Sequence, residues 1–318
     1  MMKNWIRTIS TVLVLLLLAT MFVGCKQSSE PKIEENTGDN RATYPYVVHT
    51  ASATWYLAAD DIALLGEDAF YMGFWQILKD QEADFADARK ALKGYIPDVI
   101  PVVDIYTDFT GRATISEMAG AYYNPRSNFI KVFSGWEMAE CTLLHEYVHY
   151  LTIHCAEQPT TLGFYAEGVA EYIAMIVCKN RMARSVNYCF SAEEIAQCKA
   201  HNAWDTAENC IDLMKSYFSL ADYYAQGVFV GFEYYSVSDV MELRTEQVQQ
   251  NPTVYNVSHI EAACIMAYLV ETFSRDTVFQ NWGMEPDDIE TVYGEPFSSL
   301  YQKWSAWNHE RCAALGTN

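Results

Sequence analysis

One short stretch limits the fold more than any other part of the chain, because it places three polar side chains inside an apolar helical run. Residues 141–150 read Cys-Thr-Leu-Leu-His145-Glu146-Tyr-Val-His149-Tyr. Residues four apart lie on one face of an α-helix, about 6 Å apart along its axis. Two imidazoles so placed can bind one tetrahedral zinc ion, and Glu146 lies about 100° round the helix, where it can act as a general base without binding metal. The stretch therefore predicts a helix that carries a metal site.

The residues around this motif also favour a helix. Ser134-Gly-Trp-Glu137 has the pattern of a capping box, in which Ser134 is the N-cap and Glu137 the third helical residue. The run 136–154 contains neither Pro nor Gly. Apolar residues recur in it at helical spacing, as in a stripe that faces a core: Leu144, Val148 and Leu151. We therefore expect a helix over about 136–154.

A second helix can supply the third metal ligand. It is expected to begin near Phe164 and to run to about Cys178, and it carries Glu167 and Glu171 four residues apart, hence on one face. One carboxylate facing the two imidazoles would complete a His-His-Glu set with a fourth position open to water. The other could accept a ring N–H from a ligating histidine and so orient its ring. Without the preceding motif, both acids would be read as solvated helix residues.

The two segments together resemble the gluzincin metallopeptidases, the group that includes thermolysin and the zinc aminopeptidases. The resemblance rests on His145-Glu-x-x-His149 followed by Glu167-Gly-x-Ala-x-Tyr. It implies that Glu167 is the third zinc ligand and that Glu171 supports a ligating histidine, with Glu171 as the alternative ligand. It also implies an α+β, zincin-like fold, with an N-terminal mixed sheet plus helices, an active-site helix and a mainly helical C-terminal lobe.

The C-terminal part offers one further candidate. Ser258-His259-Ile-Glu261 has the pattern of a capping box that opens a helix running to about Phe273. In gluzincins, a Tyr or His near the start of a comparable helix donates to the tetrahedral intermediate. The resemblance therefore makes His259 a candidate oxyanion donor, although an ordinary histidine at a helix start fits the pattern equally well. The segment 293–304 resembles the family's closing helix, which would bury Leu300 and Trp304.

The N-terminus has the features of an export signal. Lys3 and Arg7 precede an apolar run over 11–23, which is shorter than the roughly 20 residues that span a membrane. Phe22-Val-Gly-Cys25 then resembles a bacterial lipoprotein box, in which the cysteine receives lipid. We therefore expect a signal peptide over 1–24 and a lipid on Cys25 that anchors the protein to a membrane surface of the bacterial cell envelope.

The rest of the chain is expected to fold as one domain. Residues 25–43 are polar and predict a disordered tether, and 44–318 would form the metallopeptidase domain, possibly as two lobes, 44–180 and 181–318. Residue patterns predict a strand over 44–55, one or two helices over 58–92, a strand over 99–109, and strands over 114–133 that turn at 124–128. The aromatic-rich stretch 217–235 favours core over cleft.

Charge and cysteine content restrict the partners. The chain carries 41 acidic and 21 basic residues, for a net charge of −20, which argues against nucleic acid as a partner. Apart from Cys25, the cysteines permit disulfides in an exported protein, and we expect at least two: Cys141, Cys155, Cys178, Cys189, Cys198, Cys210, Cys264 and Cys312.

These patterns together predict a surface-anchored zinc peptidase that cleaves peptide or protein substrates. His145, His149 and Glu167 would hold one zinc ion, and Glu146 would take a proton from the attacking water and pass it to the leaving amine. Two other classes remain open. One is a lipoprotein that binds ligands on this fold without cleaving them, and the other is a zinc hydrolase that acts on cell-wall or other amide bonds.

Overall fold

The computed structural model describes residues 32–108, 120–133, 142–161, 163–189 and 252–314. The chain divides after Ile33, so every described element from the second strand onward belongs to the unit Glu34–Asn318. The expectations for the signal peptide, the capping box at Ser134 and the stretch 217–235 lie outside the described residues.

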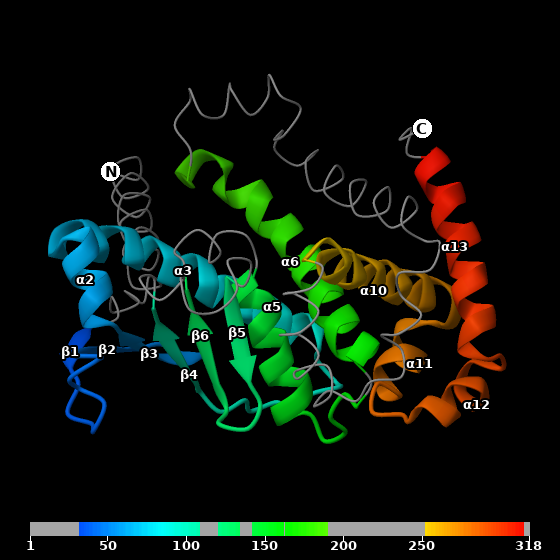
Figure 1. Cartoon of the computed structure of the whole chain (residues 1–318), viewed down its shortest axis with the longest axis horizontal. Helices are drawn as coiled ribbons and strands as arrows, with labels where there is room; N and C mark the ends of the chain where they lie inside the picture. Colours follow the sequence, from blue (N-terminus) through cyan, green and yellow to red (C-terminus); the bar gives the residue numbers. More distant parts are fainter. Residues whose placement is uncertain (1–31, 109–119, 134–141, 162, 190–251, 315–318) are drawn as a thin grey trace, which may run out of the picture. The chain divides into compact units, whose positions relative to one another are not determined.

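The described chain is α+β, as expected, and contains a six-stranded mixed sheet (Figure 1). The strands are β1 (Ile33–Glu35), β2 (Tyr46–His49), β3 (Ala53–Leu57), β4 (Val103–Thr107), β5 (Ala121–Asn124) and β6 (Phe129–Val132). The helices near the sheet are α2 (Ala59–Leu65), α3 (Glu67–Ala91), α5 (Thr142–His149), the π-helix η2 (Tyr150–Cys155) and α6 (Gly163–Cys189). The C-terminal helices are α10 (Pro252–Phe273), α11 (Arg275–Gln280), the 3-10 helix η3 (Pro286–Asp288), α12 (Ile289–Tyr293) and α13 (Phe297–Ala314). None of the described helices is long and apolar enough to cross a membrane.

The strand order β1-β2-β3-β4-β6-β5 places β5 at one edge of the sheet. Strands β3, β4 and β6 run parallel, and β2 and β5 pair antiparallel with their neighbours. The register aligns one row of side chains across the sheet: Trp55, Ile105, Ile130 and Tyr123. All four are buried, so this row marks the face that packs against the core.

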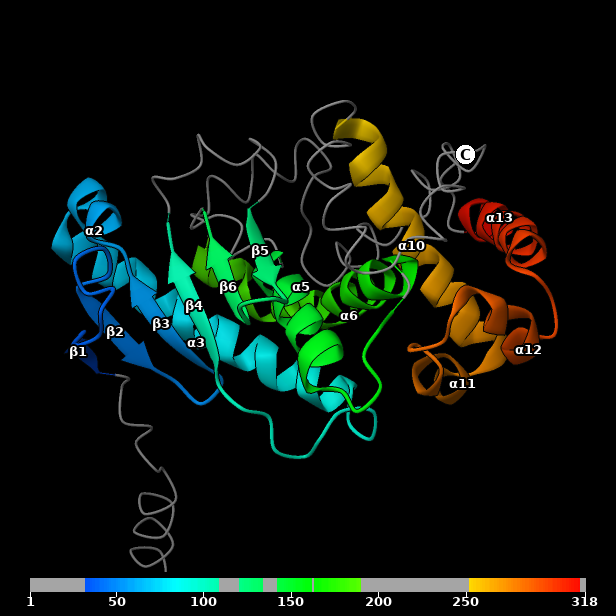
Figure 2. The same ribbon diagram turned by 60° about the horizontal axis from the view of Figure 1, so that its bottom comes forward.

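Helices α3 and α5 cover that buried face (Figure 2). The ring of Phe74 on α3 meets Trp55 edge-on at 5.6 Å. The ring of Tyr150, which directly follows α5, lies 6.2 Å from the ring of Tyr123 on the edge strand. The two helices are therefore packed between the sheet and α6, so that α5 is supported on both sides.

Aromatic side chains cross the opposite face of the sheet. Tyr56 stacks on Tyr106 at 4.5 Å, and Phe129 lies 5.4 Å from Tyr106. These side chains are only partly buried. This face is therefore less covered than the one that carries α3 and α5, and the two faces of the sheet are inequivalent.

Helices α6 and α10 form the main contact of the helical part. Gly168 lies where they cross, because a Cβ added there would come within 2.8 Å of the carbonyl oxygen of Ala262 and of Cγ of Met266. The closing helix α13 buries Leu300 and Trp304, as predicted. The absence of a side chain at Gly168 thus lets α10 approach the helix that carries Glu167.

Two sequence expectations near the N-terminus are wrong. The strand predicted over 44–55 is a hairpin, because the segment turns between β2 and β3 and pairs antiparallel with itself. The tether predicted to reach residue 43 is ordered in its last part: the Asn36 side chain donates to Asn40 and to the carbonyl of Tyr44, and the N–H of Ala59 donates to the carbonyl of Thr43. The polar side chains of this segment form the hydrogen bonds of a turn, and the segment is therefore not a disordered tether.

The helix boundaries also differ from those expected. The helix that carries Glu167 continues to Cys189, beyond Cys178, and the run from Thr142 ends as a π-helix at Cys155. The capping box predicted at Ser258 is wrong, because α10 begins at Pro252. Proline is favoured in the first turn of a helix, where its missing N–H is not needed. The helices expected over 58–92 and the turn expected at 124–128 agree with the structure, whereas the strand expected over 99–109 spans only Val103–Thr107 and the closing helix expected over 293–304 begins at Phe297.

Candidate metal centre

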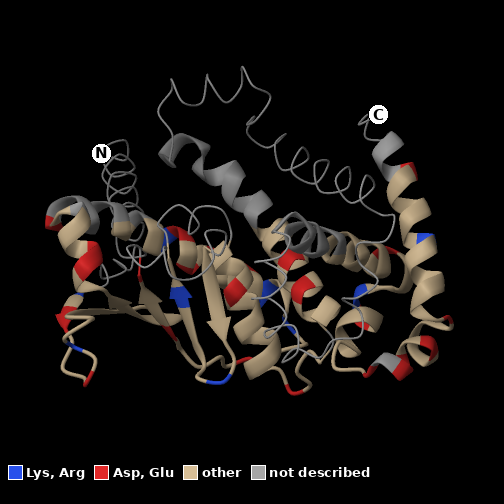
Figure 3. Cartoon of the chain, in the orientation of Figure 1, with Lys and Arg blue, Asp and Glu red and all other residues tan. Residues whose placement is uncertain are grey.

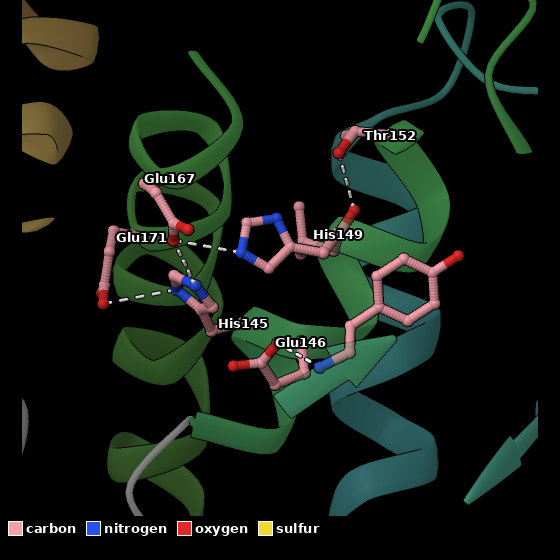
Figure 4. Close-up of polar contacts among 8 residues, drawn as sticks. His145, Glu146, His149, Thr152, Glu167 and Glu171 are labelled. Atoms are coloured by element: carbon pink, nitrogen blue, oxygen red, sulfur yellow. Dashed lines mark hydrogen bonds and ion pairs between the residues drawn. The ribbon is translucent and has the colours of Figure 1, made fainter. Parts of the chain in front are cut away.

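Three buried side chains from α5 and α6 converge on one point (Figure 4). Helix α5 brings His145 and His149 to one face, as the four-residue spacing predicts, with ring centroids 4.5 Å apart. Glu167 on α6 faces both rings: its Oε2 lies 3.0 Å from Nε2 of His145 and 3.1 Å from Nε2 of His149. The exposed fractions are 5%, 4% and 3% for His145, His149 and Glu167. The three side chains are thus almost fully buried, and both histidines present the same ring nitrogen to Glu167.

These three residues fit a single metal ion. One donor atom from each lies within 4.8 Å of the others. Two ligands at about 2.1 Å from a tetrahedral zinc ion are roughly 3.4 Å apart, so the observed separations need only a small expansion. Two imidazoles with one carboxylate is also a donor set that zinc accepts. The chemistry and spacing of the donors therefore fit one divalent ion, and the structure itself does not select zinc.

Glu171 contacts the far side of His145, and the second acid was expected beside one of the two ligating histidines. Its Oε1 lies 3.3 Å from Nδ1 of His145, so this imidazole sits between the carboxylates of Glu171 and Glu167. A carboxylate beside Nδ1 favours, in a metal-bound histidine, the tautomer in which Nε2 carries the lone pair toward the metal. The arrangement therefore favours Glu167 as ligand and Glu171 as its support, over the reverse assignment.

The charge around His145 changes its titration in the metal-free site. Burial on its own lowers the pKa of His145, but the carboxylate of Glu171, with those of Glu167 and Glu146, outweighs burial and raises the pKa to about 10. A proton on His145 thus neutralises part of the buried negative charge when no metal is present. Metal binding must displace that proton.

Glu146 is buried beside this group without belonging to it. It is 1% exposed, and its Oε2 accepts a hydrogen bond of 2.7 Å from the backbone N–H of Tyr123 on the edge strand (Figure 4). The sequence predicted the helical position of Glu146 but gave no signal for this partner, because the contact joins two segments through a main-chain atom. The carboxylate is therefore held next to the candidate metal ligands by the sheet.

Helix α3 holds α5 from the other side. Nη1 of Arg89 donates to the hydroxyl of Tyr147 and to Oγ of Ser52, both at 2.7 Å. Phe85 stacks on the ring of Tyr147 at 3.9 Å between centroids. The residue after Glu146 is thus fixed by both a cation and a ring, and no pattern in the sequence indicated either contact.

The loop between the two ligand-bearing helices is attached to the C-terminal part. Nε1 of Trp282 donates to the carbonyl of Gln158 at 2.6 Å, and Oγ1 of Thr161 donates to the carbonyl of Met284 at 2.7 Å. Two hydrogen bonds therefore tie the short connection between His149 and Glu167 to the segment that follows α11, and each of them uses a main-chain carbonyl as acceptor. This attachment fixes the position from which α6 starts.

The remaining candidate residues are His259, Cys25 and the cysteines expected to form disulfides. His259 lies inside α10 and not at its start, and its side chain is outside the described part, as is Cys25. Cys155 is a free thiol, and the expected disulfides otherwise depend on side chains that are not described.

Comparison of the chain with protein-family models, with curated proteins and with solved structures finds no match.

Proposed function

We propose that this protein is a zinc-dependent peptidase with a zincin-like fold, exported and anchored through lipid on Cys25. One observation carries the proposal: two histidines one helical turn apart share a buried carboxylate from the next helix, with a further buried carboxylate beside them. His145, His149 and Glu167 would hold the metal. When bound, a zinc ion supplies Lewis acidity, which polarises a carbonyl and lowers the pKa of water.

The protein's own residues supply the proton transfer. Glu146 is a buried acceptor beside the same three residues, and the N–H of Tyr123 keeps one of its oxygens in place. A carboxylate so placed can take a proton from the attacking water and return it to the leaving amine. Glu171 keeps His145 oriented during this exchange.

The described surface agrees with a substrate that is neutral or basic. Asp and Glu positions are spread along the described helices, and Lys and Arg positions are few among them (Figure 3). An acidic surface steers basic partners and repels acidic ones. We therefore expect the substrate to be a peptide or protein segment without strong negative charge.

Glu146→Gln tests the proposal directly. The amide keeps the size of the side chain but cannot accept the water proton, so cleavage of a mixed peptide library should fall at least about 100-fold while bound zinc stays unchanged. Glu290→Gln on α12 is the matched control, because Glu290 is exposed. It should retain both zinc and activity.

Three results would count against the proposal. Equal turnover by wild type and Glu146→Gln removes Glu146 as the base. Zinc binding without cleavage of any peptide points to a binding lipoprotein or to a hydrolase of other amide bonds. Failure to bind zinc removes the metal site itself.

A further inference from the structure

The edge strand β5 is hydrogen-bonded to β6 on one side, and no described strand pairs with its other, open edge. The N–H of Phe133 donates to the carbonyl of Gly120, so the main-chain groups of residue 120 point to β6. Main-chain groups alternate in direction along an antiparallel strand. The main-chain N–H and C=O of Tyr122, which pairs with Lys131, therefore point to β6. The N–H groups of Ala121 and Tyr123 point to the open edge.

The outward N–H of Tyr123 is directed to Glu146. It donates to Oε2 at 2.7 Å, and both residues are almost fully buried, at 2% and 1% exposed. A hydrogen bond to a carboxylate is roughly twice as strong as one between neutral groups, and it strengthens further away from water. The contact is therefore a strong restraint on the direction of the Glu146 carboxylate.

The position of Tyr123 is itself well determined. Its hydroxyl donates to Oδ1 of Asn128 at 3.0 Å, across the turn that joins β5 to β6. Asn128 has a φ of 52°, in the left-handed region that asparagine tolerates. The ring of Tyr123 also packs near Tyr150, which directly follows His149. The strand therefore cannot shift along α5 without breaking contacts at both ends of this tyrosine.

We propose that the main-chain N–H of Tyr123 is a positioning group for the general base: it fixes one oxygen of Glu146 so that the carboxylate keeps a single orientation beside the metal ligands. The inference rests on the proposed function, because it assigns a role within the same site. Because the N–H of Tyr123 already donates to Glu146, this group on the open edge of the sheet does not bind another acceptor. Glu146 and the edge strand thus act as one unit.

Replacing the amide of Tyr123 by an ester tests this role. Incorporation of the α-hydroxy acid of tyrosine at position 123 exchanges the N–H for an oxygen and keeps the side chain. In the zinc-loaded protein, kcat should fall about 10- to 100-fold, as expected when a hydrogen bond to a charged group is lost. KM should stay within about twofold, and zinc content should not change.

The same exchange at Tyr122 is the matched control. It removes a main-chain N–H from the same strand, but one that faces β6 instead of Glu146. We expect the ester at position 122 to lower stability and to leave kcat within about twofold of wild type. A purely structural role of the strand predicts equal losses of kcat at the two positions, and that result would overturn the inference.

A second readout does not depend on peptidase activity. The ester at position 123 should lower the urea midpoint of unfolding in wild type and lower it much less in Glu146→Ala, where its partner is gone. An equal shift in both backgrounds would also overturn the inference. If wild type cleaves no peptide while this coupling is present, the proposed function fails and the hydrogen bond to Glu146 stands.

Discussion

At the scale of single residues, the candidate site depends on charges that are buried together. His145 lies between Glu167 and Glu171, with Glu146 nearby, and three of these four side chains are almost fully buried. Buried acids so close together need a cation to compensate them. A metal ion is one such cation, and the proton on His145 is the other.

The metal-free protein should therefore lose stability as the pH rises. The pKa of His145 is raised from 6.5 to about 10 in the folded metal-free state. A group with a raised pKa stabilises the fold fully below its ordinary pKa and loses that contribution as the pH rises through the folded value. The unfolding free energy of chelator-treated protein should fall between about pH 6.5 and pH 10. Urea titrations across this range measure it.

Glu171→Gln is the control for that pH dependence. Removing the carboxylate that raises the pKa most should flatten the fall in stability above neutral pH. An unchanged slope in this variant would contradict the assigned charge balance around His145.

At the scale of elements, the site depends on how α6 packs between α5 and α10. Glu167 is followed by Gly168, where α10 comes so close that no side chain fits. The ligand and the helix contact are therefore adjacent on one turn, and any displacement of α6 from α10 also moves the ligand.

Gly168→Ala should consequently affect both stability and metal binding. The added methyl group would overlap the carbonyl oxygen of Ala262 and Cγ of Met266, each 2.8 Å from its position. Overpacking of this kind costs about 1–3 kcal/mol. Zinc affinity should fall as well, because Glu167 moves with the helix. Urea unfolding and competition with a zinc-binding dye measure the two effects.

The double variant Gly168→Ala/Met266→Ala separates the causes. Removing the Met266 side chain leaves the clash with the Ala262 carbonyl, so zinc affinity should recover only in part. Wild-type stability and affinity in the single variant would show that the crossing of α6 and α10 adapts freely.

The features that the sequence predicted correctly depend on residues close together in the chain. The two ligand-bearing helices, the buried positions of Leu144, Val148 and Leu151, and the turn between β5 and β6 all came from local patterns. The helical spacing placed both histidines on one face, and the resemblance assigned Glu167 as the third ligand and Glu171 as the support of a ligating histidine that it did not specify. Local periodicity determines which side chains share a face.

Contacts between distant segments were beyond local patterns. The hydrogen bond from Tyr123 to Glu146 and the contact of Arg89 with Tyr147 join separate elements, and the first uses a main-chain donor that every residue but proline has. The capping box at Ser258 misled because its residue pattern also occurs within a helix, and Pro252 supplied the better start. The two contacts depend on tertiary position, which the sequence pattern did not contain, whereas the start at Pro252 is a local signal.

At the scale of the whole molecule, the lipid proposed on Cys25 would anchor the sheet-and-helix unit that begins at Glu34. We expect Cys25→Ser to move the protein from the membrane fraction to the soluble fraction and to remove lipid from the N-terminal peptide, because acyl chains supply the membrane affinity. Cell fractionation and mass spectrometry check both changes. Cys155→Ser, which removes a free thiol elsewhere, should leave the protein in the membrane fraction.

One measurement bears most directly on the metal site: a crystal structure of the zinc-loaded protein, with anomalous scattering recorded at the zinc edge. We predict one peak per chain, about 2.0–2.2 Å from Nε2 of His145, Nε2 of His149 and a carboxylate oxygen of Glu167. Glu146 should lie beside this peak without coordinating it. A map without a peak between α5 and α6, or with a peak bound by Glu171 and not Glu167, would contradict the proposed centre.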